Sequence, residues 1–258
     1  EMLRTLQESV KYPEHWWTEK AILARRALQN GDISEAYNLA KNHGLEKGQS
    51  FVEAEWLAGW ISMRFLNENA IALDHFKAVF EGSKYPISRA RGAYWAGRAS
   101  EELKDQKKTV NWYKKAAAYS LTYYGQHAIT KLSTEHPITR SVPRKQTLSH
   151  EFVTHELVKI VKIIGKAELF DLMNPFIKQL NKLKPLANWY NAVAILARES
   201  GRPDLAIYTA KKAYRAGFTL IEEGYPTLNT AYYSTQIDLS LLYALIRQES
   251  AFNVRAIS

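Results

Sequence analysis

Four segments of the chain share one layout: an apolar helix, a short polar turn with Gly, Asn or Asp, and a second, Ala-rich amphipathic helix. They span residues 22–44, 57–80, 93–117 and 192–217. Small residues recur at matching places after each turn, namely Ala36, Ala40, Ala72, Ala116, Ala206 and Ala210. Small side chains let paired helices approach closely, and a spacing of about four residues keeps them on one helix face. We therefore expect pairs of helices that pack through these alanines.

The repeat spacing and the scarcity of strand signals together predict an all-α chain. The first three copies step by roughly 35 to 38 residues, the period of tetratricopeptide-like helix pairs, although the full consensus of that family is absent. Alternating β-branched runs, which predict strands, are rare and short. Each helix pair has an apolar face that it cannot bury alone, so residues 1–220 are expected to form a curved superhelical stack, a tetratricopeptide-like solenoid.

Two stretches interrupt the helical pattern. Residues 133–149 are polar and contain two prolines, which predicts an irregular surface connection. Residues 217–236 include Gly224 and Pro226, which prevent a continuous helix. Within this second break we expect a linker over residues 221–236, followed by a separate final segment, residues 237–258.

Composition excludes several classes of site and partner. The chain has no cysteine, which rules out disulfides, thiolate metal sites and cysteine nucleophiles. No apolar run approaches the roughly 20 residues of a membrane span, so no integral membrane segment is expected. The formal net charge of +9 favours anionic partners such as nucleic acid, an acidic membrane surface or a wall polymer. Because the basic residues are spread along the chain and no nucleic-acid-binding motif is present, we interpret most of them as solvated helix surface.

Paired aromatic residues punctuate the expected helices. The pairs are Trp16 with Trp17, Trp56 with Trp60, Tyr94 with Trp95, Trp112 with Tyr113, and Trp189 with Tyr190. Large aromatic side chains are usually buried, so packing between repeats is the favoured interpretation. Rings on the concave side of the stack could instead be platforms on which sugars stack.

The final helix carries the strongest chemical candidate, Glu249. Leu242, Leu245, Ile246 and Glu249 stand at i, i+3, i+4 and i+7, so the glutamate continues an apolar stripe. A carboxyl on a buried face is desolvated, which raises its pKa and lets it act as a general acid near neutral pH. The alternative is a glutamate that emerges at the end of the helix and pairs with Arg247 or Arg255.

The run from Leu241 to Ser258 resembles the opening motif of the lysozyme-like domain in soluble lytic murein transglycosylases. The matching positions are Arg247, Gln248, Glu249, Ser250, Ala251, Phe252, Asn253, Ala256 and Ser258. Residues 85–129 are also similar to the helical superhelix that precedes this domain in the family. The shared features there are Tyr94-Trp95-Ala96-Gly97-Arg98, Trp112-Tyr113, Ala116-Ala117 and Tyr123-Tyr124-Gly125-Gln126.

The resemblance implies a peptidoglycan-cleaving lyase that needs no metal and no cofactor. Members of the family cleave the β-1,4 bond between N-acetylmuramic acid and N-acetylglucosamine and form a 1,6-anhydromuramoyl product. The position of Glu249 is that of the glutamate that first protonates the glycosidic oxygen and then acts as a base toward the C6 hydroxyl. Because the nucleophile is part of the substrate, one carboxyl suffices. Ser250 resembles the residue that orients the carboxyl or the substrate; a helix-terminal serine that satisfies backbone groups is the alternative.

The family motif continues with a Gly-Leu-Met-Gln string and a domain that forms the sugar cleft, beyond the last residue of this sequence. The expectation is therefore that these 258 residues alone are inactive. The resemblance further implies a periplasmic protein exported by a signal peptide that this sequence does not include. Its expected partner is the peptidoglycan glycan strand, with cell-wall or divisome proteins as further candidates for the repeats. Two other functions stay open: a non-catalytic protein-binding scaffold, and a hydrolase like goose-type lysozyme.

Overall fold

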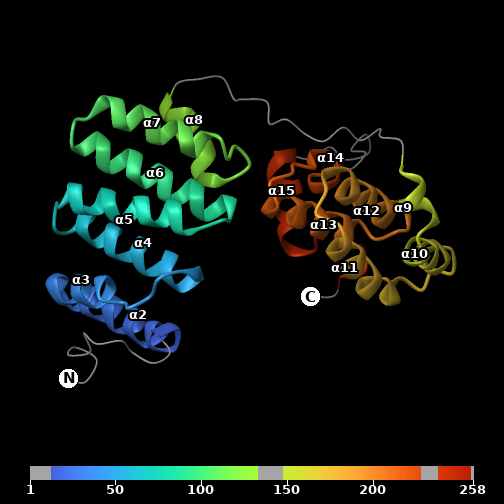
Figure 1. Ribbon diagram of the computed structural model, residues 1–258, viewed down its shortest axis with the longest axis horizontal. Helices are drawn as coiled ribbons and strands as arrows, with labels where there is room; N and C mark the ends of the chain where they lie inside the picture. Colours follow the sequence, from blue (N-terminus) through green and yellow to red (C-terminus); the bar gives the residue numbers. More distant parts are fainter. Residues whose placement is uncertain (1–12, 133–147, 228–237, 257–258) are drawn as a thin grey trace. The chain divides into compact units, whose positions relative to one another are not determined.

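The computed structural model describes residues 13–132, 148–227 and 238–256 (Figure 1). The described residues form α-helices and one short 3-10 helix, and none of them lies in a strand, which confirms the all-α prediction. The chain divides into two compact units, Glu1–Thr139 and Arg140–Ser258. The residues of the expected repeat domain, 1–220, therefore fall in both units. We describe each unit by itself.

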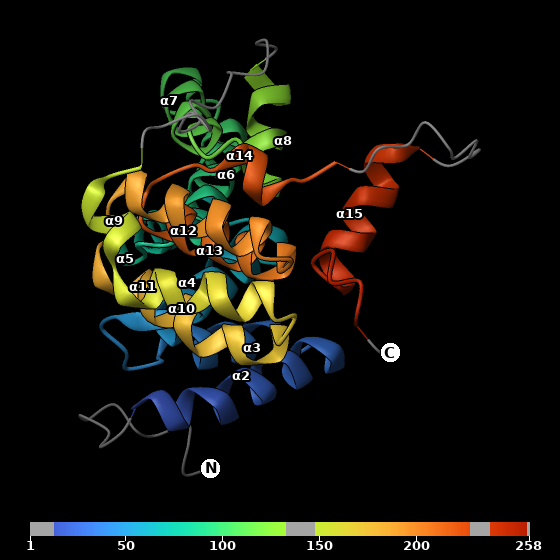
Figure 2. The same ribbon diagram turned by 90° about the vertical axis from the view of Figure 1, so that its right-hand side faces the viewer.

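Unit 1 consists of helices that each pack against the next along the chain (Figures 1 and 2). They are α2 (Pro13–Asn30), α3 (Ile33–Lys41), α4 (Gly48–Arg64), α5 (Asn69–Gly82), α6 (Pro86–Glu102), α7 (Gln106–Ala117) and α8 (Tyr123–Leu132). The first three repeated segments correspond to α2 with α3, α4 with α5, and α6 with α7. Short turns join the helices of each pair, as at Gly31, whose φ of 86° glycine adopts without steric cost.

Unit 2 contains the fourth repeated segment, which forms α12 and α13, packed side by side (Figures 1 and 2). Its elements are α9 (His150–Thr154), α10 (Glu156–Lys166), η1 (Phe170–Leu172), α11 (Met173–Leu183), α12 (Ala187–Glu199), α13 (Pro203–Arg215), α14 (Ile221–Gly224) and α15 (Leu239–Glu249). Ser149 is the N-cap of α9, because its side chain accepts a hydrogen bond from the Phe152 amide. The rest of the predicted connection, residues 133–147, lies outside the described residues.

The predicted linker, residues 221–236, begins with a short helix. This helix, α14, packs against α12 and α13, and its residues Glu223 and Gly224 are buried. Residues 228–236 of the linker lie outside the described residues. The break in the helical pattern that Gly217 signals is present, since Gly217 follows α13 with a φ of 91°.

The alanines that recur after the turns lie in the core, as predicted. Ala36, Ala40, Ala72, Ala116, Ala206 and Ala210 are all 5% exposed or less. The aromatic pairs divide into two groups. The buried rings are Trp17, Tyr94, Trp112, Tyr113, Trp189 and Tyr190, whereas Trp16, Trp56, Trp60 and Trp95 are half-buried. Trp56 and Trp60 share a face of α4 and stack with their ring centroids 6.1 Å apart.

A glycine allows a close approach between α5 and α6. A Cβ atom on Gly92 would lie 2.7 Å from the amide nitrogen of Phe80 and 2.9 Å from the carbonyl oxygen of Phe76. Both neighbours are backbone atoms of α5, so they cannot rotate away as a flexible side chain could. Any side chain at position 92 must therefore push the two helices apart.

Gly92→Ala should destabilise unit 1 by about 1–3 kcal/mol, the usual cost of overpacking. Alanine is the better helix former by about 1 kcal/mol, so a net loss would show that packing outweighs propensity. Urea unfolding followed through the amide signals of α5 and α6 measures this effect. The matched control is Ile87→Ala on the same helix, because that side chain is 69% exposed. Equal stability of the Gly92→Ala variant and the parent would contradict the prediction.

No helix of the described residues has the length and apolar character needed to cross a membrane.

Candidate active site

Helix α15 places Glu249 in its last turn. The helix begins at an aspartate N-cap: the Asp238 carboxylate accepts hydrogen bonds from the amides of Ser240 (2.7 Å) and Leu241 (3.3 Å). These backbone hydrogen bonds lower the pKa of Asp238. Capping residues of this kind fix where a helix starts. Once the start is fixed, the turn in which Glu249 falls is fixed as well.

Arg247 connects α15 with α14. Its Nε donates a hydrogen bond of 2.7 Å to the carbonyl oxygen of Gly224, and its guanidinium lies 4.3 Å from the ring centroid of Tyr225. Arg247 also lies near Lys211 of α13, whose pKa is lowered first by burial and then by the charges of Arg247 and Arg215. Arg247, the arginine of the Arg-Gln-Glu-Ser run, therefore contacts Gly224 and Tyr225 and does not pair with Glu249.

The Glu249 side chain is exposed, and no residue of α15 is buried. Leu242 and Ile246 are half-buried, while Leu245 is 51% exposed. The expectation that the apolar stripe buries Glu249 is therefore wrong for the part of the chain that the structure describes. The physical reason is that helical periodicity places apolar side chains on one face but does not determine whether another element packs against that face. No described element buries this face of α15.

The alternative interpretation of Glu249, an ion pair with a nearby arginine, is not found either. Within residues 13–132, 148–227 and 238–256, the Glu249 carboxylate has no hydrogen bond or ion pair. Arg247 contacts Gly224 and Tyr225, and the Arg255 guanidinium lies 3.8 Å from the ring centroid of Phe170. The carboxylate therefore remains accessible at the end of the helix.

Ser250 ends α15 and bonds to the helix backbone. Both its amide (3.1 Å) and its hydroxyl (3.2 Å) donate hydrogen bonds to the carbonyl oxygen of Ile246. This is the arrangement expected of a helix-terminal serine that satisfies a backbone group. The hydroxyl makes no hydrogen bond to the Glu249 carboxylate in this structure, although the two residues are adjacent.

The two residues after Ser250 both have left-handed backbone conformations. Ala251 has a φ of 50° and Phe252 a φ of 61°, which is uncommon for residues with a Cβ. The Phe252 ring is 8% exposed and lies 6.4 Å from the Tyr243 ring. Asn253 completes the turn, since its amide donates to the Ser250 carbonyl and its side chain accepts from the Arg255 amide. The motif includes these residues, but the tight turn that they form was not anticipated from the sequence.

The surroundings of Glu249 hold no cluster of metal ligands. Among the described residues, no group of three or more His, Cys, Asp or Glu side chains is placed to hold a metal ion. Glu249 is the carboxyl that α15 presents at its C-terminal end.

Comparisons with protein-family models, with curated proteins and with solved structures give no match to this chain. Function is consequently inferred from the residues themselves and from the geometry of α15.

Arg247→Ala should loosen α15, because the variant loses one charged hydrogen bond and one cation–π contact. Together these are worth about 2 kcal/mol. Hydrogen exchange of the α15 amides should therefore become about 10- to 30-fold faster, while exchange in α12 stays unchanged. Gln248→Ala, a change at the exposed neighbouring position, is the control. Unchanged exchange in the Arg247→Ala variant would mean that these contacts do not hold the helix.

Proposed function

We propose that this chain belongs to a peptidoglycan lytic transglycosylase and supplies its acid/base residue, Glu249. The observation that carries the proposal is the Arg-Gln-Glu-Ser run at the end of a capped helix, followed at once by a strained turn. Left-handed residues other than glycine cost free energy and cluster at functional sites. An accessible carboxyl beside such a turn is a suitable place for proton transfer to a bound glycan.

The proposed chemistry needs only one carboxyl. Protonated Glu249 donates its proton to the oxygen between N-acetylmuramic acid and N-acetylglucosamine as the glycosidic bond breaks. The resulting carboxylate then accepts the proton of the muramoyl C6 hydroxyl, whose oxygen attacks C1 and closes the 1,6-anhydro ring. The carboxyl is thereby protonated again. An intramolecular nucleophile of this kind has a high effective concentration, which removes the need for a second carboxylate.

General acid catalysis near neutral pH requires a carboxyl whose pKa is raised, and burial is the usual means. The proposal therefore requires that further polypeptide cover α15. Two exposed leucines that share a face support this: Leu241 and Leu245, one turn apart on α15, are 55% and 51% exposed. A helix with this pattern ordinarily packs its apolar face against another element. In the proposal that element belongs to a lysozyme-like domain of which α15 is the first helix.

In the same proposal, the helix pairs of the two units form the non-catalytic part of the enzyme. We infer that the helix pairs form a superhelical, tetratricopeptide-like arrangement that holds the catalytic domain or binds cell-wall proteins. A peptidoglycan-cleaving enzyme meets its substrate outside the cytoplasmic membrane, so the proposed location is the periplasm.

The test is the digestion of purified sacculi by the full product of the gene that encodes this chain. Mass spectrometry of the released muropeptides should find 1,6-anhydromuramoyl ends. A hydrolase like goose-type lysozyme would instead release products heavier by one water. If no muropeptide is released from the sacculi, the enzyme proposal fails and a non-catalytic protein-binding scaffold takes its place.

A further inference from the structure

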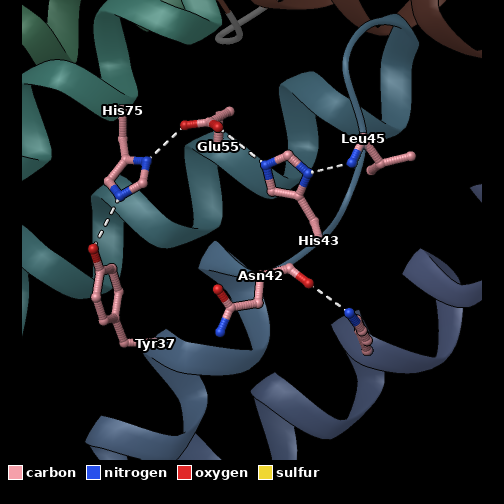
Figure 3. A network of polar contacts seen from close by, with 7 residues as sticks. Tyr37, Asn42, His43, Leu45, Glu55 and His75 are labelled. Carbon is pink, nitrogen blue, oxygen red and sulfur yellow. Dashed lines mark hydrogen bonds and ion pairs between the residues drawn. The ribbon is translucent and has the colours of Figure 1, made fainter. Parts of the chain in front are cut away.

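Unit 1 contains a chain of polar contacts that joins three helices and one connection (Figure 3). The Glu55 carboxylate of α4 lies between two histidines, with Oε1 3.0 Å from Nε2 of His43 and Oε2 2.6 Å from Nδ1 of His75. The second nitrogen of His75 lies 3.2 Å from the Tyr37 hydroxyl of α3. The second nitrogen of His43 lies 2.9 Å from the Leu45 amide. His43 and Leu45 belong to the connection between α3 and α4, residues 42–47.

The partners of His43 dictate where its proton is. The Leu45 amide can only donate, so Nδ1 of His43 must carry a lone pair and accept. Nε2 must then carry the hydrogen and donate to the Glu55 carboxylate. The hydrogen bonds of His43 thus fit its Nε2–H tautomer, because a second proton on Nδ1 would face the Leu45 N–H directly.

His75 is bound in the opposite sense and lacks this restriction. Its Nδ1 donates to Glu55, and its Nε2 accepts from the Tyr37 hydroxyl when the ring is neutral. A hydroxyl can rotate and accept as well as donate. His75 can therefore take up a second proton and keep both contacts, whereas His43 cannot.

Charged groups lie near the network in addition to the Glu55 carboxylate, which is 3.0 Å from Nε2 of His43. Lys20 of α2 donates to the Asn42 carbonyl oxygen (2.5 Å) and remains a cation in acid. Lys41 lies over the Tyr37 ring. Burial raises the pKa of Tyr37, and the nearby negative charge of Glu68 adds to this effect. The His43 ring itself is 8% exposed, and the rings of Trp17 and Phe51 meet it edge to face. A second proton on Nδ1 of His43 would replace the Leu45 contact by two facing N–H groups, while Nε2 keeps its contact with the Glu55 carboxylate.

We propose that the connection formed by residues 42–47 is a pH-sensitive latch, closed when His43 is neutral and opened when Nδ1 of His43 is protonated. Histidine is the side chain that ordinarily changes charge between about pH 5 and 8, so this is the range in which the latch is tested. Opening frees the α3–α4 connection at Leu45 while the Lys20 contact to Asn42 persists. The device is independent of the function proposed for Glu249, which lies in unit 2.

The first experiment determines the two tautomers. Long-range nitrogen–proton NMR of the 258-residue chain at about pH 7.5 should find the hydrogen of His43 on Nε2 and that of His75 on Nδ1. The assignments come from the loss of one signal in each of His43→Asn and His75→Gln. A hydrogen on Nδ1 of His43 at this pH would overturn the proposal.

The second experiment measures the latch through the Leu45 amide. Between about pH 7.5 and about pH 5, its hydrogen-exchange protection, corrected for the intrinsic pH dependence, should fall about tenfold or more, the loss of one hydrogen bond. The Val79 amide in the buried part of α5 is the internal reference.

Two variants serve as controls. In His43→Asn the side-chain amide oxygen can still accept from the Leu45 amide but cannot be protonated, so the fall in protection should disappear. In His75→Gln it should persist. Protection that does not change with pH in the parent, or that falls equally in His43→Asn, would overturn the proposal.

Discussion

Glu249→Gln should reduce the release of anhydro-muropeptides from sacculi by about 10²- to 10⁴-fold, because the amide cannot give or take the proton that the reaction needs. The helix should survive the change, since the side chain is exposed and makes no hydrogen bond or ion pair with the described residues. The assay compares the full gene product with its variant. Circular dichroism and the melting temperature verify that the variant is folded.

A matched control exists one position earlier. Gln248→Ala changes an exposed neighbour of Glu249 in the same turn and should leave the rate within about twofold, since it removes no proton-transfer group. A Glu249→Gln variant that keeps more than about a tenth of the parent rate would exclude Glu249 as the catalyst.

Unit 1 should lose about 3 kcal/mol of its stability in acid through Glu55 alone. Burial raises the pKa of this carboxyl, but the hydrogen bonds from His43 and His75 outweigh burial and lower the pKa from 4.5 to about 2. A carboxyl whose pKa is lowered by folding stabilises the folded state above its unfolded pKa. That stabilisation is lost as the pH falls from about 4.5 toward 2. Each unit by which the pKa of Glu55 differs between the folded and unfolded states corresponds to about 1.4 kcal/mol of stability.

The measurement compares the parent with Glu55→Gln as a function of pH. Urea unfolding followed through amide signals of α4 and α5 reports unit 1 separately from unit 2. Glu55→Gln should be the less stable protein near neutral pH, and the gap should narrow by about 3 kcal/mol between about pH 6 and about pH 2. Glu53→Gln is the control, because Glu53 is an exposed glutamate on the same helix. A gap that does not change with pH would refute the acid linkage.

The sequence determined the helices themselves. Apolar spacing, alanine positions and turn residues act over a few neighbouring positions, so the four repeated segments and the helix that carries Glu249 were predictable. The alanines after the turns are buried where the repeat places them. Asp238 was not singled out from the sequence, but an aspartate directly before a helical run is a recognisable start signal.

Only the tertiary structure decided what surrounds each helix. Periodicity assigned Glu249 to an apolar stripe, yet burial depends on whether another element packs there, and none of the described ones does. The contacts of Glu55 could not be predicted either, because its partners lie 12 and 20 residues away along the chain, and Tyr37 and His75 are 38 apart. Their meeting depends on how α3, α4 and α5 pack. The division into units follows the same rule, since repeated local patterns specify helix pairs but not which pairs share a core.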